Sequence, residues 1–206
     1  MELIRLSDIS LNEAAAKAAA VLRAGGIVLF PTDTLYGLAV DITNGEAVER
    51  LRELKSRERR KPFSVILPSV EHIEQHAELH TDARAIAETH LPGALTLVLP
   101  AKPHISPDVT LNGTIGIRIP NDAFSLALAQ VFGKPFSATS ANETHLTTPT
   151  TAHGVIEHFK LKAHLISLVV DAGDRAGGKP STVVTFIDGK PYVTREGAIS
   201  REDLGL

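Results

Sequence analysis

The sequence predicts an α/β fold, in which a single domain holds a mixed, twisted sheet with flanking helices. Short apolar runs alternate with amphipathic segments early in the chain, and the last third is rich in strand-forming residues that end in a hairpin. With 206 residues and 43% hydrophobic content, the chain can bury one core of ordinary size. We therefore expect one domain over residues 1–206.

Helices are predicted from capping residues and from periodic apolar positions. Ser10, three residues before Glu13, forms a capping-box pattern ahead of the Ala-rich stretch 11–24, and a pair of glycines then stops that helix. Asn44 can cap a second helix. The other predicted helices follow from the same reasoning. They are 45–57, two between 69 and 90, one over about 122–131 and one around 151–160.

Strands are predicted from short runs of β-branched and apolar residues. The dipeptide Asp188-Gly189 separates the last two runs and predicts a hairpin turn. Functional residues are expected on loops at strand ends, because ligands of open sheets usually bind there. The predicted strands are 27–31, 63–67, 96–100, 114–120, a short one near 136, 165–173, 181–187 and 191–195.

Composition excludes several classes of protein. The chain has no Cys for disulfides, no apolar run near the roughly 20 residues of a membrane span, and an N-terminus without signal-peptide features. We therefore expect a cytoplasmic protein with no membrane partner. A net charge of -3 argues against binding nucleic acid over the whole surface, and an aromatic content of 4% leaves few stacking platforms for single strands.

A cluster of cations lies where the second helix ends. It consists of Lys55, Arg57, Arg59, Arg60 and Lys61. A positive patch on an acidic protein indicates an anionic ligand. The alternative is a solvated helix end, because Lys and Arg favour the negative end of the helix dipole. Spacing alone leaves both interpretations open.

Two polar loops follow predicted strands. Segment 31–41, PTDTLYGLAVD, places three hydroxyls, a carboxylate and a glycine after a buried strand, and segment 136–142, FSATSAN, repeats the arrangement. Such loops can present hydroxyls and backbone N–H groups to a small polar ligand. Together with the cationic cluster, they indicate a phosphate or carboxylate site.

Two other patterns favour structural interpretations. Segment 173–179, GDRAGGK, has the spacing of a phosphate-binding loop, but Pro180 and a strand follow it instead of a helix, which argues against that function. His72, His76 and His80 recur every four residues and would share one helix face. Their acidic neighbours favour a solvated face over a metal site.

Six blocks, in order, resemble the YrdC-like threonylcarbamoyl-AMP synthases. The blocks are PTDTLYGL, the K-x-R of Lys55 and Arg57 with Lys61-Pro62, LPGALTLVL, TIGIRIP, ATSAN and KPSTVV. The chain resembles the short, single-domain form of this family. The resemblance implies an α/β fold around a concave, basic cavity. It also implies a reaction that joins L-threonine, bicarbonate and ATP into threonylcarbamoyl-AMP and pyrophosphate, and a partner complex that passes the threonylcarbamoyl group to tRNA.

The resemblance implies a role for each matching position. The implied catalytic set is Lys55, Arg57, Ser140 and Asn142. The implied ATP-binding set is Arg57, Lys61, Thr114, Ser140 and Arg195. The implied threonine-binding set is Thr34, Arg118 and Ser181. ATP is then a substrate, Mg²⁺ would share the charge of its phosphates, and no side chain is assigned to a metal. Cations suit this chemistry because guanidinium groups pair well with carboxylates and phosphates.

The chain departs from the family pattern at two places. Ile66 stands where many members carry a His that contacts threonine, and Ile cannot hydrogen-bond. Thr144 and His145 replace the usual Ser-Gly after Asn142, and the loss of glycine is expected to change how that loop closes over ATP.

Two alternative functions share the fold. One is a non-catalytic module that binds double-stranded RNA, including tRNA, or takes part in ribosome maturation through a concave basic surface. The other is the carbamoyl-transfer part of another pathway, which usually belongs to a larger, Cys-rich chain. The combination of Lys55, Arg57, Ser140 and Asn142 favours the enzyme, because an RNA-binding module has no need of it.

Overall fold

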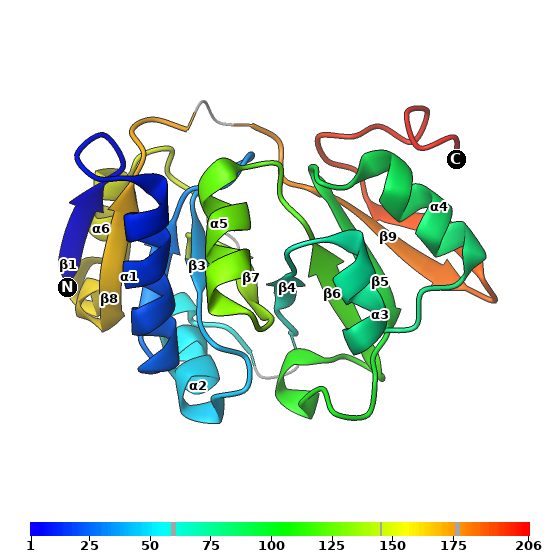
Figure 1. Cartoon of the computed structure of the whole chain (residues 1–206), viewed down its shortest axis with the longest axis horizontal. Coiled ribbons are helices and arrows are strands. Elements are labelled where there is room, and N and C mark those ends of the chain that lie inside the picture. Colours follow the sequence, from blue (N-terminus) through cyan, green and yellow to red (C-terminus); the bar gives the residue numbers. More distant parts are fainter. Residues whose placement is uncertain (59–60, 145, 176–177) are drawn as a thin grey trace.

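Figure 1 shows the computed structural model, a long twisted sheet with helices packed along it. The structure describes residues 1–58, 61–144, 146–175 and 178–206. Arg59 and Arg60 of the cationic cluster lie outside the described residues. His145 also lies outside the described residues, as do Ala176 and Gly177 of the segment 173–179.

The described strands form one mixed sheet, with parallel and antiparallel neighbours. They are β1 (Glu2–Arg5), β2 (Ile27–Phe30), β3 (Gly37–Ala39), β4 (Ser64–Ile66), β5 (Leu95–Pro100), β6 (Thr114–Arg118), β7 (Phe136–Ser140), β8 (Ile166–Asp171), β9 (Thr182–Ile187) and β10 (Lys190–Arg195). Their spatial order is β1-β8-β2-β3-β7-β4-β6-β5-β9-β10. The non-consecutive order brings residues from distant parts of the chain to the middle of the sheet. The predicted α/β class is confirmed.

Helices connect these strands. The α-helices are α1 (Leu11–Arg23), α2 (Gly45–Lys55), α3 (Ile73–His76), α4 (Thr81–His90), α5 (Ala123–Phe132) and α6 (Ala152–Phe159). Short 3-10 segments are η1 (Val70–His72), η2 (Pro107–Val109) and η3 (Lys160–Leu165). None of the helices in the described ranges is long and apolar enough to cross a membrane.

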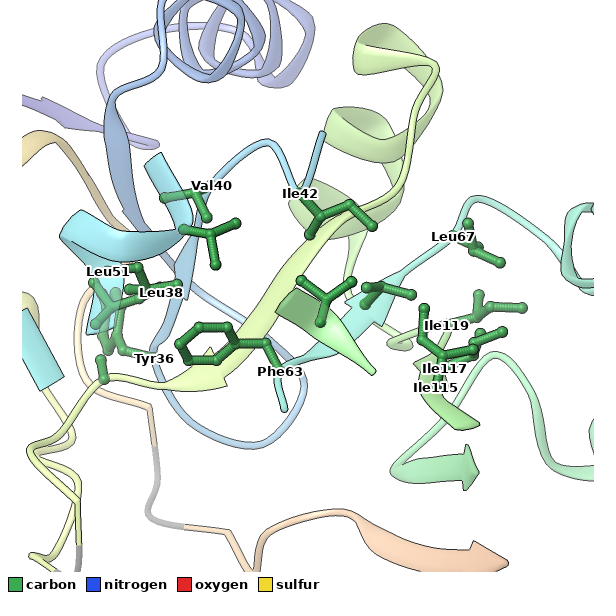
Figure 2. Close-up of a cluster of buried hydrophobic side chains, with 14 of the residues drawn as sticks. Tyr36, Leu38, Val40, Ile42, Leu51, Phe63, Leu67, Ile115, Ile117 and Ile119 are labelled. Carbon is green, nitrogen blue, oxygen red and sulfur yellow. The ribbon is translucent and has the colours of Figure 1, made fainter. Parts of the chain in front are cut away.

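Side-chain alternation along the strands separates two apolar clusters. Val28 and Phe30 of β2 pack in a cluster with α1 and α5, which lie side by side in Figure 1. Ile27 and Leu29 point to the opposite face and join a larger cluster. Figure 2 shows part of the larger cluster running from Leu38 and Leu51 to the isoleucines of β6. Helices therefore cover both faces of the central strands.

The α1–α5 face changes character at β6. Ile66 of β4 belongs to the apolar cluster on this face, and its register partner on β6 is Arg118. Thr96 and Ser64 lie next to Gly116 on the same face, because a Cβ at Gly116 would be 3.4 Å from the Thr96 methyl and 2.9 Å from the Ser64 hydroxyl. On this face of the sheet, polar side chains therefore take over from the apolar cluster that α1 and α5 cover.

Most predicted elements are confirmed. Ser10 accepts the N–H of Glu13 at 3.2 Å and starts α1, and Asn44 accepts the N–H of Ala47 at 3.1 Å and starts α2. The second helix ends at Lys55, two residues earlier than predicted, because Ser56 has a φ of 49° and reverses the chain. Asp188 and Gly189 both have positive φ, as the predicted hairpin between β9 and β10 requires.

Two strands were not predicted. The segment 31–41, expected as a polar loop, contains β3, whose Gly37 pairs with both Phe30 and Ser140. The strand β1 buries only Ile4 and so has no alternating pattern to detect. β1 forms because it pairs in parallel with β8, which lies far away in the sequence.

The expectation that His72, His76 and His80 share a helix face is wrong. α3 ends at His76 because Ala77 is extended, and His80 lies outside that helix at the start of α4. His76 instead lies 3.2 Å from His104, between ring nitrogens. Within the described part of the chain, no group of three His, Cys, Asp or Glu residues could hold a metal ion.

Candidate active site

A pocket of about 190 Å³ opens at the middle of the sheet. Its walls come from the loop between β2 and β3, the end of β7, strands β4, β5 and β6, and the segment before β9. The lining side chains are mainly hydroxyls and guanidinium groups. Six predicted site residues line it, namely Thr34, Arg57, Arg118, Ser140, Ser181 and Arg195. The structure thus gathers residues from widely separated parts of the sequence.

Arg118, at the end of β6, is the most buried of the three pocket arginines. Its side chain donates to the carboxylate of Asp33 and, at 3.2 Å, to the hydroxyl of Thr34. Burial lowers the pKa of Arg118, although the Asp33 carboxylate opposes that change. The Nε of Arg118 has no hydrogen-bond partner among the described residues. Arg118 nonetheless lines the pocket, where its positive charge favours an anion.

The loop from 31 to 36 is held by its own side chains. The hydroxyl of Thr32 donates to the carbonyl of Leu35 at 2.6 Å and accepts the N–H of Thr34 at 3.2 Å. The second carboxylate oxygen of Asp33 accepts the N–H of Asn121 at 3.0 Å. The loop is therefore fixed at its tip, and Thr34 faces Arg118 without help from a ligand.

Ser181 belongs to a chain of polar groups on the opposite wall. Its hydroxyl lies 2.9 Å from that of Thr96, and Arg195 donates to the Ser181 hydroxyl at 3.2 Å and to its carbonyl at 2.8 Å. Gly197 allows this packing, because a Cβ there would lie 2.1 Å from the carbonyl oxygen of Pro180. The C-terminal segment thereby fixes the position of Ser181.

Arg57 reaches the pocket from the cationic cluster. Its guanidinium lies 5.0 Å from the ring centre of Phe63 and donates to the carbonyls of Lys61 and Pro62 at 3.2 and 2.7 Å. Burial lowers the pKa of Arg57, and the positive charge of Arg52 lowers it further. The group is held in place as a cation next to the open space.

Lys55 lies under the pocket instead of in its wall. Its side chain is 1% exposed, and its ammonium donates to the backbone carbonyls of Ser140 and, at 2.7 Å, Asn142. Burial, with a smaller contribution from the charge of Arg57, lowers the pKa of Lys55 to about 7. Lys55 therefore contacts the loop that carries the Ser140 hydroxyl.

Asn142 also acts on Ser140. Its side-chain oxygen accepts the Ser140 hydroxyl, and its amide nitrogen donates to the carbonyls of Glu143, at 2.9 Å, and Leu146. Asn142 is 9% exposed and is not among the lining residues. It orients the hydroxyl that faces the pocket.

Three residues of interest lie away from the pocket wall. The ammonium of Lys61 pairs with the Glu58 carboxylate at 3.2 Å. The backbone carbonyl of Lys61 accepts a hydrogen bond from the Arg57 side chain. Thr114 begins β6, the strand that Arg118 ends, and donates to the carbonyl of Leu111 at 2.8 Å. Ile66 is fully buried in the apolar cluster.

Three lining residues, Thr32, Tyr36 and Thr139, belong to the two polar loops that the sequence indicated, without an individual role. Two others, Ser64 and Thr96, were not predicted from the sequence. The hydroxyl of Tyr36 donates to the Gly173 carbonyl at 2.9 Å and accepts the N–H of Ala172, and burial raises its pKa to about 12. Tyr36 is therefore a neutral structural phenol. Ser64 and Thr96 are polar residues within predicted strands, and this could have indicated a pocket wall. The register of the strands, however, decides which face of the sheet these side chains occupy.

Comparison with known proteins places this geometry in a family context. A family model for Sua5, YciO and YrdC proteins, described as "Telomere recombination", matches residues 20–197. A threonylcarbamoyl-AMP synthase of Pyrococcus abyssi is 35% identical over 190 residues, which cover 91% of this chain and 55% of that protein. A putative threonylcarbamoyl-AMP synthase of Methanocaldococcus jannaschii is 36% identical over 180 residues, which cover 87% of this chain and 84% of that protein.

A solved structure shows the same fold. The crystal structure of P. abyssi Sua5 complexed with L-threonine has a TM-score of 0.88 and 31% identity, and covers 98% of this chain and 59% of that one. The chain thus spans little more than half the length of the Pyrococcus relative. The likeness covers the whole sheet and therefore every wall of the pocket.

Proposed function

Because the chain belongs to the Sua5/YciO/YrdC family, we propose that it is an L-threonylcarbamoyladenylate synthase. Its substrates would be L-threonine, bicarbonate and ATP, and its products threonylcarbamoyl-AMP, pyrophosphate and water. The observation that carries the proposal is the pocket itself, in which Arg57, Arg118 and Arg195 face one space together with threonine and serine hydroxyls.

Threonine fits the end of the pocket formed by Arg118. A carboxylate placed there would pair with the Arg118 guanidinium, which lines the pocket, and would offset the desolvation of this buried group. The hydroxyls of Thr34 and Ser181 line the same pocket and can bond the polar groups of a small amino acid. The related P. abyssi Sua5 has been crystallised with L-threonine, which supports threonine as a substrate.

ATP requires more space than the enclosed pocket provides. A volume of about 190 Å³ lies below the range of about 300–1,000 Å³ that is typical for drug-sized ligands. We propose that the α-phosphate enters near Arg57 and Ser140, and that the rest of the nucleotide extends outside. Arg195, which lines the rim, and Lys61 and Thr114, which lie beyond it, are candidates for these outer contacts.

The reaction divides into two bond-forming steps. The threonine amine attacks the carbon of bicarbonate with loss of water, and an oxygen of the resulting carbamate then attacks the α-phosphorus while pyrophosphate leaves. Each reactant carries an anionic group, so the guanidinium groups act by holding these groups together and by stabilising the developing charge. The described pocket residues offer no activated nucleophile, and catalysis rests on positioning.

Mg²⁺ would enter as part of the substrate MgATP. No carboxylate lines the pocket among the described residues, and Asp33 is already engaged by Arg118. Mg²⁺ commonly relies on substrate phosphates and water for most of its ligands, which is compatible with a wall of hydroxyls. Within this scheme the protein contributes cations, and the nucleotide contributes the ligands of the ion.

The product is a reactive mixed anhydride that an acceptor must consume. We propose that a tRNA-modifying partner transfers the threonylcarbamoyl group to an adenosine of tRNA, and that the protein works in the cytoplasm. The names of the relatives support threonylcarbamoyl-AMP as the product.

Pyrophosphate release tests the proposal. With threonine, bicarbonate and MgATP all present, release is expected, and omission of either threonine or bicarbonate should abolish it. Release that is independent of threonine would contradict the proposed activity. If no release occurs under any condition but double-stranded RNA binds, the chain is an RNA-binding module of the same fold.

A further inference from the structure

The loop after β7 carries both Ser140 and Asn142, and other elements hold it from below. From the end of α2, the carbonyl of Lys55 accepts the N–H of Thr144 at 3.1 Å and its hydroxyl at 3.2 Å. Thr144 therefore ties the loop to the end of α2. Other contacts hold the adjoining residue, Glu143.

The side chain and the backbone of Glu143 both form hydrogen bonds that hold this residue in place. Its carboxylate accepts Lys162 at 2.8 Å and Ser56 at 3.1 Å, and these hydrogen bonds lower the pKa of Glu143. Its backbone N–H donates to Nε2 of His158, on α6, at 3.0 Å. The peptide between Asn142 and Glu143 thus depends on a histidine lone pair.

A backbone N–H can only donate, so the contact requires an unprotonated Nε2. Protonation of His158 would set two N–H groups against each other and break the bond. The charged groups near the ring are the Glu143 carboxylate from the loop and Lys162 from η3, which pairs with that carboxylate at 2.8 Å. The ring of Phe159 lies 5.3 Å from the His158 ring between centroids.

We propose that His158 is a positioning residue for the nucleotide end of the site. Its neutral ring holds the Glu143 peptide, and through it fixes Asn142 and the Ser140 hydroxyl. Loss of this acceptor releases the loop and weakens the use of MgATP without altering the threonine end of the pocket. This inference rests on the proposed synthase activity.

Two variants test whether His158 acts as a hydrogen-bond acceptor or only fills space. His158→Gln keeps a side-chain oxygen that can accept the Glu143 N–H but cannot be protonated near neutral pH. His158→Leu keeps comparable apolar bulk and removes the acceptor. The KM for MgATP, the KM for threonine and kcat would be measured by pyrophosphate release at pH 7.5, with thermal unfolding as a check on folding.

His158→Gln should keep a KM for MgATP near the wild-type value, because its side-chain oxygen still accepts the Glu143 N–H. His158→Leu should raise that KM about 5- to 10-fold, as loss of one hydrogen bond implies, and should leave the KM for threonine unchanged. A normal KM for MgATP in His158→Leu, or an equal rise in both variants, would overturn the proposal.

A direct readout keeps the proposal independent of the activity. The Glu143 amide proton should exchange with solvent faster in His158→Leu than in the wild type and in His158→Gln, as followed by ¹⁵N NMR. If the wild type makes no product but this difference is present, the synthase assignment fails and the positioning role stands. If the exchange rate is the same in all three proteins, the positioning role is wrong whatever the activity.

Discussion

The ammonium nitrogen of Lys55 lies 2.7 Å from the backbone carbonyl oxygen of Asn142, in one of the least exposed places in the described chain. A second bond from the same ammonium reaches the carbonyl of Ser140. The first member of the K-x-R pattern thus supports the S-x-N loop from beneath, while Arg57 faces the pocket. Support and contact are divided between two cations of one motif.

Replacement of Lys55 by Met should separate activity from stability. The variant removes two charge-assisted hydrogen bonds to the loop, so kcat/KM for MgATP is expected to fall about 10- to 100-fold. It also removes a buried cation, so the thermal unfolding midpoint should be unchanged or higher. Pyrophosphate release and calorimetry check the two expectations. A variant that unfolds while retaining its activity per folded molecule would show that Lys55 is structural only.

The same lysine predicts a pH dependence of stability. Burial lowers the pKa of Lys55 in the folded protein to about 7, whereas the unfolded chain keeps an ordinary value of about 10.4. Between these values the unfolded state binds the extra proton, so stability rises with pH, by at most about 1.4 kcal/mol per pH unit. The free energy of unfolding of the wild type, relative to Lys55→Met, should increase from pH 7 to pH 9. An unchanged difference would place the folded pKa outside this window.

Arg57 and Arg52 provide a matched pair, because both guanidinium groups lie 5.0 Å from the ring centre of Phe63. Only Arg57 lines the pocket. Arg57→Ala should raise the KM for MgATP about 30-fold, as expected for loss of a charged contact worth about 2 kcal/mol, with little loss of stability. Arg52→Ala should lower the unfolding temperature and leave that KM unchanged. Equal effects of the two variants on KM would contradict the assignment.

Arg118 should control the affinity for threonine. Arg118→Ala is expected to raise the KM for threonine by about 30-fold or more, since a carboxylate would lose its buried partner and Asp33 would lose its counter-charge. Arg118→Lys should recover part of this loss, because Lys keeps the charge but not the planar geometry. Steady-state kinetics with threonine varied at saturating MgATP gives the result. A change confined to the KM for MgATP would refute the threonine site.

Gly197 should link the C-terminal segment to the pocket. A Cβ there would lie 2.1 Å from the Pro180 carbonyl oxygen, so Gly197→Ala must displace the backbone next to Ser181. We expect a loss of about 1–3 kcal/mol in unfolding free energy and a higher KM for threonine. Gly45→Ala is the control, because nothing lies within 4 Å of its new methyl group and a helix favours alanine. A tolerated Gly197→Ala would mean that this segment can move away from Ser181.

Local patterns predicted most elements of the fold, because caps such as Ser10 and Asn44 and the Asp188-Gly189 turn act within a few residues. β1 escaped prediction because it pairs with the distant β8 and buries only one side chain. β3 is only three residues long, and it lies between the neighbouring β2 and the distant β7. For the site, motif blocks identified Thr34 and Arg118, which hydrogen-bond at 3.2 Å across 84 residues. Thr96 and the support of the loop by Lys55 follow from strand register and packing, which no local pattern encodes.

The most direct test of the account identifies the product. The protein would be incubated with MgATP, L-threonine and ¹³C-bicarbonate, and the nucleotides would be analysed by mass spectrometry, with Arg118→Ala in parallel. We expect an adenylate that carries both threonine and the ¹³C label in the wild-type reaction, and little of this adenylate in the variant. Consumption of ATP without a labelled threonine adenylate would contradict the proposal that this pocket joins threonine, bicarbonate and the α-phosphate.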